Sequence, residues 1–136
     1  MTMMEKPLPV PTPTSRPFWE GLRQRKVLLQ RCLDCEVYVH YPRSNCPNCL
    51  GANLEWREVS GLGTLYTYTI ARRPTAPQFQ DETPQKIAVV ELDEGPRLTT
   101  TLVNVDEAAI KVGMRVRPVF EDVQGTEVTL LRYEPA

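Results

Sequence analysis

The chain has 136 residues, of which 41% are hydrophobic and 24% charged, with a formal net charge of −1. This composition is typical of one ordinary soluble domain or two small ones. The apolar runs are only a few residues long, which excludes a membrane-spanning helix of about 20 residues. The first residues also lack the apolar core of a secretory signal, so we expect a cytoplasmic protein with no membrane partner.

The charge is unevenly divided along the chain. Residues 1–57 carry 8 basic and 5 acidic residues, whereas residues 58–136 carry 8 basic and 12 acidic residues. Neither part has the basic excess of a protein that follows a phosphate backbone. The charge distribution therefore argues against a nucleic-acid partner.

The first segment, residues 1–15, is rich in proline. Prolines at positions 7, 9, 11 and 13 alternate with small or apolar residues, and such a segment is extended and cannot pair as a central strand. We expect a flexible tail over residues 1–15. The alternative is an arm that lies along a partner.

A short helix is predicted over residues 16–26. Pro17 suits its first turn, and Phe18, Trp19 and Leu22 form one apolar stripe. A helix of this length is marginal in isolation, so the stripe must be covered. Either it packs on its own ribbon or barrel, or these three residues bind a second protein.

All four cysteines lie in two Cys-x-x-Cys pairs separated by ten residues: Cys32 and Cys35, then Cys46 and Cys49. This spacing is typical of a zinc ribbon, in which two facing turns place four thiolates around one Zn²⁺. Four protein ligands leave no open position for a substrate, so the predicted zinc is structural. A ribbon of some 30 residues has little apolar core, and zinc must supply much of its folding energy.

In the remaining chain, residues 58–136, apolar and polar residues alternate over short stretches, as in strands separated by turns. Trp56, just before it, is expected to pack the ribbon against this second part of the chain. The predicted strands are 65–70, 87–92, 97–103, 115–120 and 127–133, with one helical turn at 106–110 and a long loop at 71–85. Five short strands with this loop fit a small closed barrel such as an OB-fold. The predicted fold class is mainly β: a short N-terminal helix and rubredoxin-like zinc ribbon over residues 16–57, then an OB-fold barrel over residues 58–136.

A catalytic role would require a nucleophile or an acid–base pair. His40 is the only histidine, and we interpret it as a packing or surface residue of the ribbon. The cysteines are committed to the metal. We therefore predict no catalytic residue.

A ribbon followed by a barrel, with these residues in this order, resembles the zinc-ribbon/OB-fold family of acyl-CoA-associated proteins. The likeness covers residues 16 to about 133. The likeness is carried by the two Cys-x-x-Cys turns, which we call knuckles, and by Pro42-Arg43. It is also carried by residues 54–56, 60–63, 66–69, 90–96 and 112–116.

The resemblance implies a non-catalytic accessory subunit rather than an enzyme. Its expected partner is a thiolase-like or other acyl-CoA enzyme, docked by the ribbon and helix, and the barrel is expected to help hold a CoA thioester. A partner with two-fold symmetry would give a two-plus-two hetero-oligomer.

Arg72, Arg73 and Lys86 flank the long loop of the barrel, a region that often lies at the ligand face of OB-folds. We predict that these cations meet CoA phosphates and that Phe79, within the loop, contacts an acyl chain or a partner. The alternatives are ordinary surface charge and a cap on the barrel mouth.

Two other functions compete with the accessory role. Tyr66 and Tyr68 are two residues apart on one predicted strand, so they are expected to share a face on which single-stranded nucleic acid could stack. The acidic barrel argues against this alternative. A stand-alone esterase or transferase ranks last, because the sequence offers no catalytic set.

Overall fold

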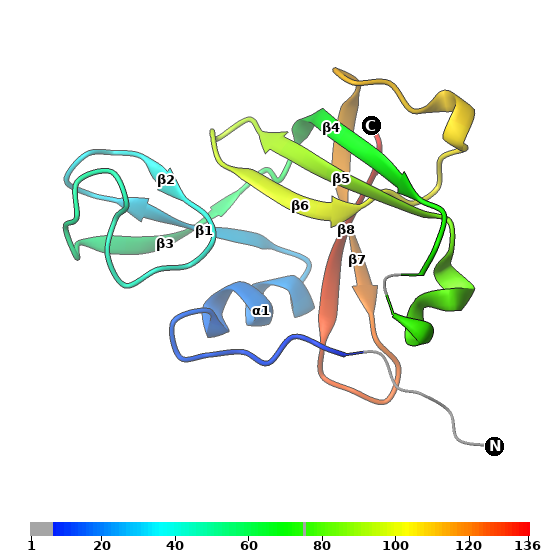
Figure 1. Cartoon of the computed structure of the whole chain (residues 1–136). Helices are drawn as coiled ribbons and strands as arrows, with labels where there is room; N and C mark the ends of the chain where they lie inside the picture. Colours follow the sequence, from blue (N-terminus) through cyan, green and yellow to red (C-terminus); the bar gives the residue numbers. More distant parts are fainter. Residues whose placement is uncertain (1–6, 75) are drawn as a thin grey trace.

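The computed structural model in Figure 1 describes residues 7–74 and 76–136. Two β-sheets lie side by side, and a helix lies at their junction. Part of the predicted tail, residues 1–6, falls outside the described residues. Residues 7–15 form an arm of turns and irregular backbone, which passes below the helix in Figure 1 and runs toward the hairpin between the last two strands.

The helix α1 (Arg16–Arg23) buries Phe18, Gly21 and Leu22 and packs against strands of both sheets. Gly21 weakens a helix in isolation, but here it permits a close approach. A Cβ atom at this position would lie 2.8 Å from the Leu28 side chain. The apolar stripe predicted from the sequence is therefore largely covered by the chain itself.

The first sheet, the ribbon, has the strand order β2-β1-β3 with antiparallel pairing. Its strands are β1 (Val27–Cys32), β2 (Tyr38–Val39) and β3 (Leu54–Val59). The strand between the two cysteine pairs, β2, is only two residues long. It ends because the chain turns toward the second sheet, where the Tyr41 hydroxyl accepts a 3.0 Å hydrogen bond from the Thr99 amide.

The second sheet, the barrel, has the order β6-β5-β4-β7-β8 with antiparallel neighbours. Residues 77–82 within the predicted loop form a 3-10 helix. The elements are β4 (Gly63–Ala71), the 3-10 helix η1 (Pro77–Glu82), β5 (Gln85–Leu92), β6 (Arg97–Thr101), the 3-10 turn η2 (Glu107–Ala109), β7 (Arg115–Asp122) and β8 (Thr129–Pro135).

The barrel is open along one seam, whereas the sequence led us to expect a closed one. In the described chain, a single parallel bridge, Leu102 to Tyr133, joins β6 to β8. Farther along the seam, a side chain replaces the backbone ladder, since the Thr100 hydroxyl donates a 2.8 Å hydrogen bond to the Leu131 carbonyl. Residues of the helix and of the segment just after β2 line a cavity at this edge, together with residues of β6 and β8.

The strand β1 belongs to both hydrophobic cores. Val27 and Leu29 pack in the barrel core with Leu65, Val90 and Tyr133, while Cys32 at the other end of β1 packs in the ribbon core. Trp56, predicted to join the modules, is not among the apolar residues that form the barrel core in the described structure. The junction is instead formed by β1 itself.

Candidate functional site

The four cysteines converge at the tip of the ribbon, with their Sγ atoms all within 4.8 Å of one another. The Sγ atoms of Cys32 and Cys49 are 3.5 Å apart, and those of Cys35 and Cys46 are 3.6 Å apart. Zn–S bonds of about 2.3 Å in a tetrahedron require sulfur separations of about 3.8 Å. The predicted ligands therefore fit Zn²⁺.

The two knuckles are the same turn made twice. The Cys32 carbonyl accepts a 2.9 Å hydrogen bond from the Glu36 amide, and the Cys46 carbonyl accepts one of 2.8 Å from the Leu50 amide. Glu36 and Leu50 both have positive φ angles. A side-chain hydrogen bond from Asn48 lowers the pKa of the Cys35 thiol to about 6.

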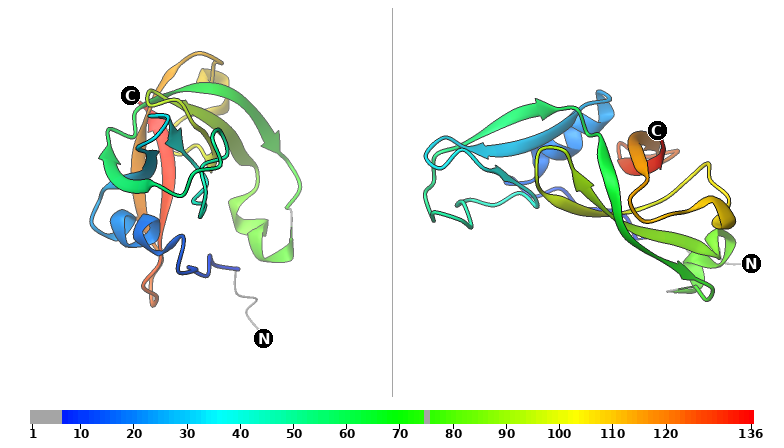
Figure 2. Two further views of the ribbon diagram at one scale, coloured as in Figure 1. Left: turned by 90° about the vertical axis from the view of Figure 1, so that its left-hand side faces the viewer. Right: turned by 90° about the horizontal axis from the view of Figure 1, so that it is seen from above.

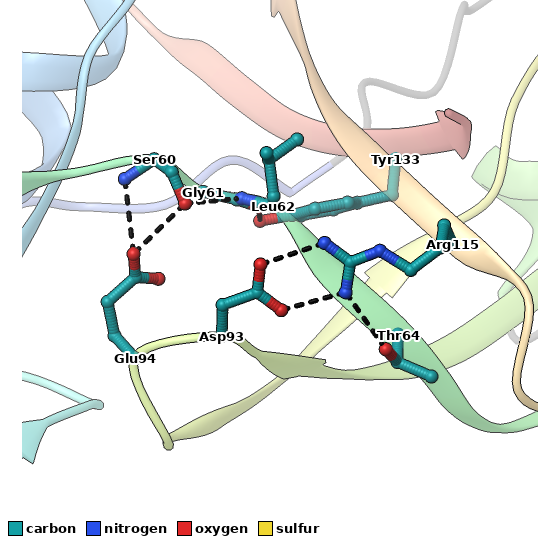
Figure 3. A network of polar contacts seen from close by, with 8 residues as sticks. All are labelled: Ser60, Gly61, Leu62, Thr64, Asp93, Glu94, Arg115 and Tyr133. Carbon is teal, nitrogen blue, oxygen red and sulfur yellow. Dashed lines mark hydrogen bonds and ion pairs between the residues drawn. The ribbon is translucent and has the colours of Figure 1, made fainter.

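The linker between ribbon and barrel is held by the polar network in Figure 3. The buried Tyr133 hydroxyl donates a 2.7 Å hydrogen bond to the Gly61 carbonyl. Gly61 has φ +73°, and a Cβ atom there would lie 2.9 Å from Val27, so this turn requires glycine. Beside it, Arg115 donates two 2.8 Å hydrogen bonds to Asp93, which lowers the pKa of that carboxyl.

The three residues predicted to bind a partner differ in their exposure. Leu22 is fully buried and Phe18 is only 7% exposed, so both pack within the chain. Trp19 is partly exposed and contacts Phe18 edge-on at 5.1 Å between ring centroids. Of the three, Trp19 offers most surface to a partner, and its role stays a prediction.

The cations predicted to meet CoA phosphates are not equivalent. Arg72 forms an ion pair with Glu107 on η2, and Lys86 donates to the Val105 carbonyl. Arg73 is exposed. Phe79 lies on η1 and lines a cavity of about 540 Å³ with the β7–β8 hairpin. Two of the three cations, Arg72 and Lys86, thus already have partners within the chain. Ligand binding by the three cations and Phe79 stays a prediction.

Tyr66 and Tyr68 do not share a face, contrary to the expectation from their spacing. The pairing of β4 with β5 shifts register between Leu65 and Thr67, and such a bulge reverses the alternation of side chains. Tyr66 is consequently 47% exposed, with the Arg97 guanidinium 3.8 Å from its ring centroid. Tyr68 packs against the barrel core. The predicted two-tyrosine stacking platform is absent.

Comparison with known proteins gives two family matches. Residues 19–55 match the model described as ChsH2, rubredoxin-like zinc ribbon domain, and residues 56–121 match ChsH2, C-terminal OB-fold domain. A DUF35 domain-containing scaffold protein of Methanothermobacter thermautotrophicus is 35% identical over 108 residues, covering 78% of this chain and 80% of the relative. The chain belongs to the ChsH2-type zinc-ribbon/OB-fold family.

Membership of the ChsH2-type family confirms the predicted fold class and the structural zinc. A solved structure named Ltp2-ChsH2(DUF35) aldolase superposes with a TM-score of 0.82 at 34% identity, covering 94% of this chain and 98% of that one. A probable enoyl-CoA hydratase alpha subunit of Thermomonospora curvata is 38% identical over 121 residues, which are 88% of this chain and 37% of the relative. The chain therefore spans little more than a third of that protein.

Sequence reasoning missed the contacts that dock the ribbon of this ChsH2-type chain on its barrel. Arg25, after α1, donates hydrogen bonds of 2.9 and 2.6 Å to the Asp122 carboxylate at the end of β7, and Tyr41 caps the edge of β6. A positive φ at Arg25 has no local sequence signal. Within the described residues, no helix is long and apolar enough to cross a membrane.

Proposed function

We propose that the chain is a non-catalytic subunit that docks on an acyl-CoA enzyme. The observation that supports this most directly is its likeness to nearly the whole length of the ChsH2(DUF35) chain in a structure named for an aldolase. Relatives named scaffold proteins, and one named as a hydratase alpha subunit, agree with a role inside a larger assembly.

The form of the zinc site supports the same role. Four cysteine ligands complete the zinc shell, so the metal fixes the ribbon and offers no position for substrate. The ribbon projects to one side of the barrel (Figure 2), and Trp19 on α1 is partly exposed. We propose the ribbon tip and Trp19 as the docking surfaces. In this proposal the unit of residues 16–57 binds the partner, and residues 58–136 help hold the CoA thioester.

We further propose that the partner is thiolase-like and that two copies of each chain assemble. Capture of the tagged chain from its native host, followed by mass spectrometry and mass measurement of the complex, tests both parts. We expect an acyl-CoA enzyme in a one-to-one ratio. Trp19→Ala should reduce its recovery at least tenfold, whereas Tyr66→Ala, which removes an exposed aromatic ring from the barrel, should leave recovery unchanged.

The capture experiment has clear opposing outcomes. Recovery of the chain alone, or with proteins that do not act on acyl-CoA, would contradict the accessory role. A thiolase-like partner would support both the accessory role and the proposed partner type, whereas a hydratase or aldolase would support only the accessory role.

A further inference from the structure

A cavity of about 550 Å³ lies at the open seam of the barrel. We call it the seam cavity; its walls come from the arm, α1, the segment just after β2, β6 and β8. The apolar residues among its lining include Val10, Phe18, Trp19, Leu98, Leu130 and Leu131. Its volume falls within the range of about 300–1,000 Å³ found for small-molecule sites. The sequence predicted a binding role for Phe18 and Trp19 of this lining, as contacts to a partner protein, but no small-molecule site here.

His40 brings a specific polar group to this mainly apolar cavity. It lines the cavity, with its ring 5.2 Å from that of Phe18 and 4.2 Å from that of Tyr41 between centroids. Its Nδ1 atom is enclosed and has no hydrogen-bond partner among the described residues. A proton on Nδ1 would therefore be an unpaired buried donor, which is costly.

The protonation of His40 follows from this enclosure. Burial lowers its pKa to about 4, so the ring is neutral near pH 7. The single proton is favoured on Nε2, because Nδ1 has nothing to donate to. Nε2 is thus the nitrogen left to serve a ligand, and it serves as a hydrogen-bond donor. A carbonyl oxygen is the matching ligand atom.

Charge around the cavity favours a neutral ligand. Arg132 is the only charged residue among its described lining, and that guanidinium already donates to Glu121 and Thr101. The adjoining cavity beyond Leu130 is lined by Glu82, Glu121 and Asp122. Among the described residues that line the two cavities, the single cation, Arg132, is paired with Glu121, so neither cavity offers an unpaired cation to a phosphate or carboxylate.

The arm covers the cavity without fastening it. Pro9 and Val10 lie over its edge, and Val10 is 85% exposed. Within the described part of the chain, the first hydrogen bonds of the arm are those of Thr12 with Ser15 and Arg16. Among the described residues, 7–11 make no hydrogen bond, so no such bond has to break there for a ligand to enter.

We propose that the seam cavity binds the acyl chain of a thioester, with the thioester carbonyl accepting a hydrogen bond from His40 Nε2. The proposal depends on the proposed function in one respect: the accessory role on an acyl-CoA enzyme is the reason to name a thioester as the natural ligand. The cavity by itself fits a neutral apolar chain that bears a carbonyl group. Binding of such a ligand can be tested without a partner enzyme.

The test uses Trp19, which lines the cavity, as a fluorescent reporter. The chain has two tryptophans, so Trp56→Phe leaves Trp19 as the only one. The full chain with this change is titrated with S-decanoyl-N-acetylcysteamine and with S-decyl-N-acetylcysteamine, which lacks the carbonyl. We expect saturable changes in emission, with the thioester bound about tenfold more tightly, as one hydrogen bond predicts.

Two variants make the test specific to the site. His40→Phe keeps a flat ring but removes the donor, so it should bind both probes equally and no more tightly than the parent binds the thioether. Thr99→Phe fills the cavity from an exposed position on β6 and should abolish binding of both. This variant keeps the test decisive even if His40→Phe does not fold. Zinc content and circular dichroism report the fold of each.

The proposal is overturned if the parent does not distinguish the two probes, or if Thr99→Phe binds as the parent does. Binding of decanoate as tight as that of the thioester would also overturn it, because the site is argued to prefer a neutral group. If the unmodified chain captures no acyl-CoA enzyme, the accessory role is contradicted instead. The ligand titration and the capture experiment can therefore fail independently of each other.

Discussion

The ribbon and the barrel are stabilised by different physical effects. The buried core of the ribbon consists of Cys32, Val39 and Cys46, of which two are metal ligands. The barrel core has eleven buried members and includes none of the cysteines. The first module is therefore stable because of a metal, and the second because of buried apolar surface. The strand β1, which contributes to both cores, couples the two.

The largest expected effect comes from removing a zinc ligand. Structural zinc contributes apparent values of ~10–16 kcal/mol in small fingers, as much as the whole stability of a typical domain. We expect Cys46→Ser to lose zinc and to unfold the ribbon. It should also weaken the barrel, because Val27 and Leu29 lose the strand that positions them. Zinc analysis and hydrogen exchange measure these effects.

Pro47→Ser is the control for this prediction, since it changes an exposed residue of the same knuckle that is no ligand. It should retain zinc and the protection of its amides. Full zinc occupancy in Cys46→Ser would contradict a ribbon stabilised by metal. Unchanged exchange in the barrel would show that β1 does not couple the modules.

The next largest effect should come from the barrel core. Leu65 is fully buried, and Leu→Ala changes at such sites typically cost ~2–5 kcal/mol. Leu65→Ala should lower the free energy of unfolding by that amount without changing zinc content. Leu62→Ala, which alters a side chain 38% exposed just before β4, should remain within ~0.5 kcal/mol of the parent. Denaturant titration compares the two, and equal effects would contradict the assigned core.

The features that the sequence revealed are those encoded locally. A Cys-x-x-Cys knuckle is completed within five residues, as the bonds from Cys32 to Glu36 and from Cys46 to Leu50 show. The spacing of the cysteines was therefore sufficient to predict the metal centre. The alternation along β4 to β8 likewise predicted the strands of the barrel.

The features that the sequence did not reveal depend on distant contacts. Arg25 and Asp122 are separated by 97 residues, and Tyr41 and Thr99 by 58, so no periodicity links them. The bulge in β4 could not be predicted either, because the pattern around Tyr66 alternates on both sides of it. The seam cavity is lined by segments far apart in the chain, and for this reason the sequence indicated only a packing or surface role for His40.

A smaller effect is expected from the single histidine as the pH changes. The pKa of His40 is about 4 in the folded chain and about 6.5 in an unfolded one. Between these values the unfolded chain binds a proton that the folded chain does not, so stability falls as the pH falls from 6.5 toward 4. Between pH 7 and 5 this loss is ~2 kcal/mol.

His40→Phe should remove that part of the pH dependence. Any loss of zinc in acid is common to both proteins, so the difference between their unfolding free energies at pH 5 and pH 7 isolates the histidine. Parallel curves for the two proteins would show that His40 is hydrated in the folded chain, which would also weaken the case for the seam cavity.

The smallest effect concerns the linker that joins the two modules. Tyr133→Phe keeps the buried ring but leaves the Gly61 carbonyl (Figure 3) without its donor. We expect a loss of ~1 kcal/mol, near the low end for an unpaired buried group, because the linker can move toward water. Amide exchange should increase at Leu62 and Gly63. Tyr68→Phe is the control, since its hydroxyl makes no hydrogen bond in the described structure, and it should be neutral. If both variants are neutral, the linker is positioned by the backbone conformation of Gly61 and by the Asp93–Arg115 pair rather than by the tyrosine.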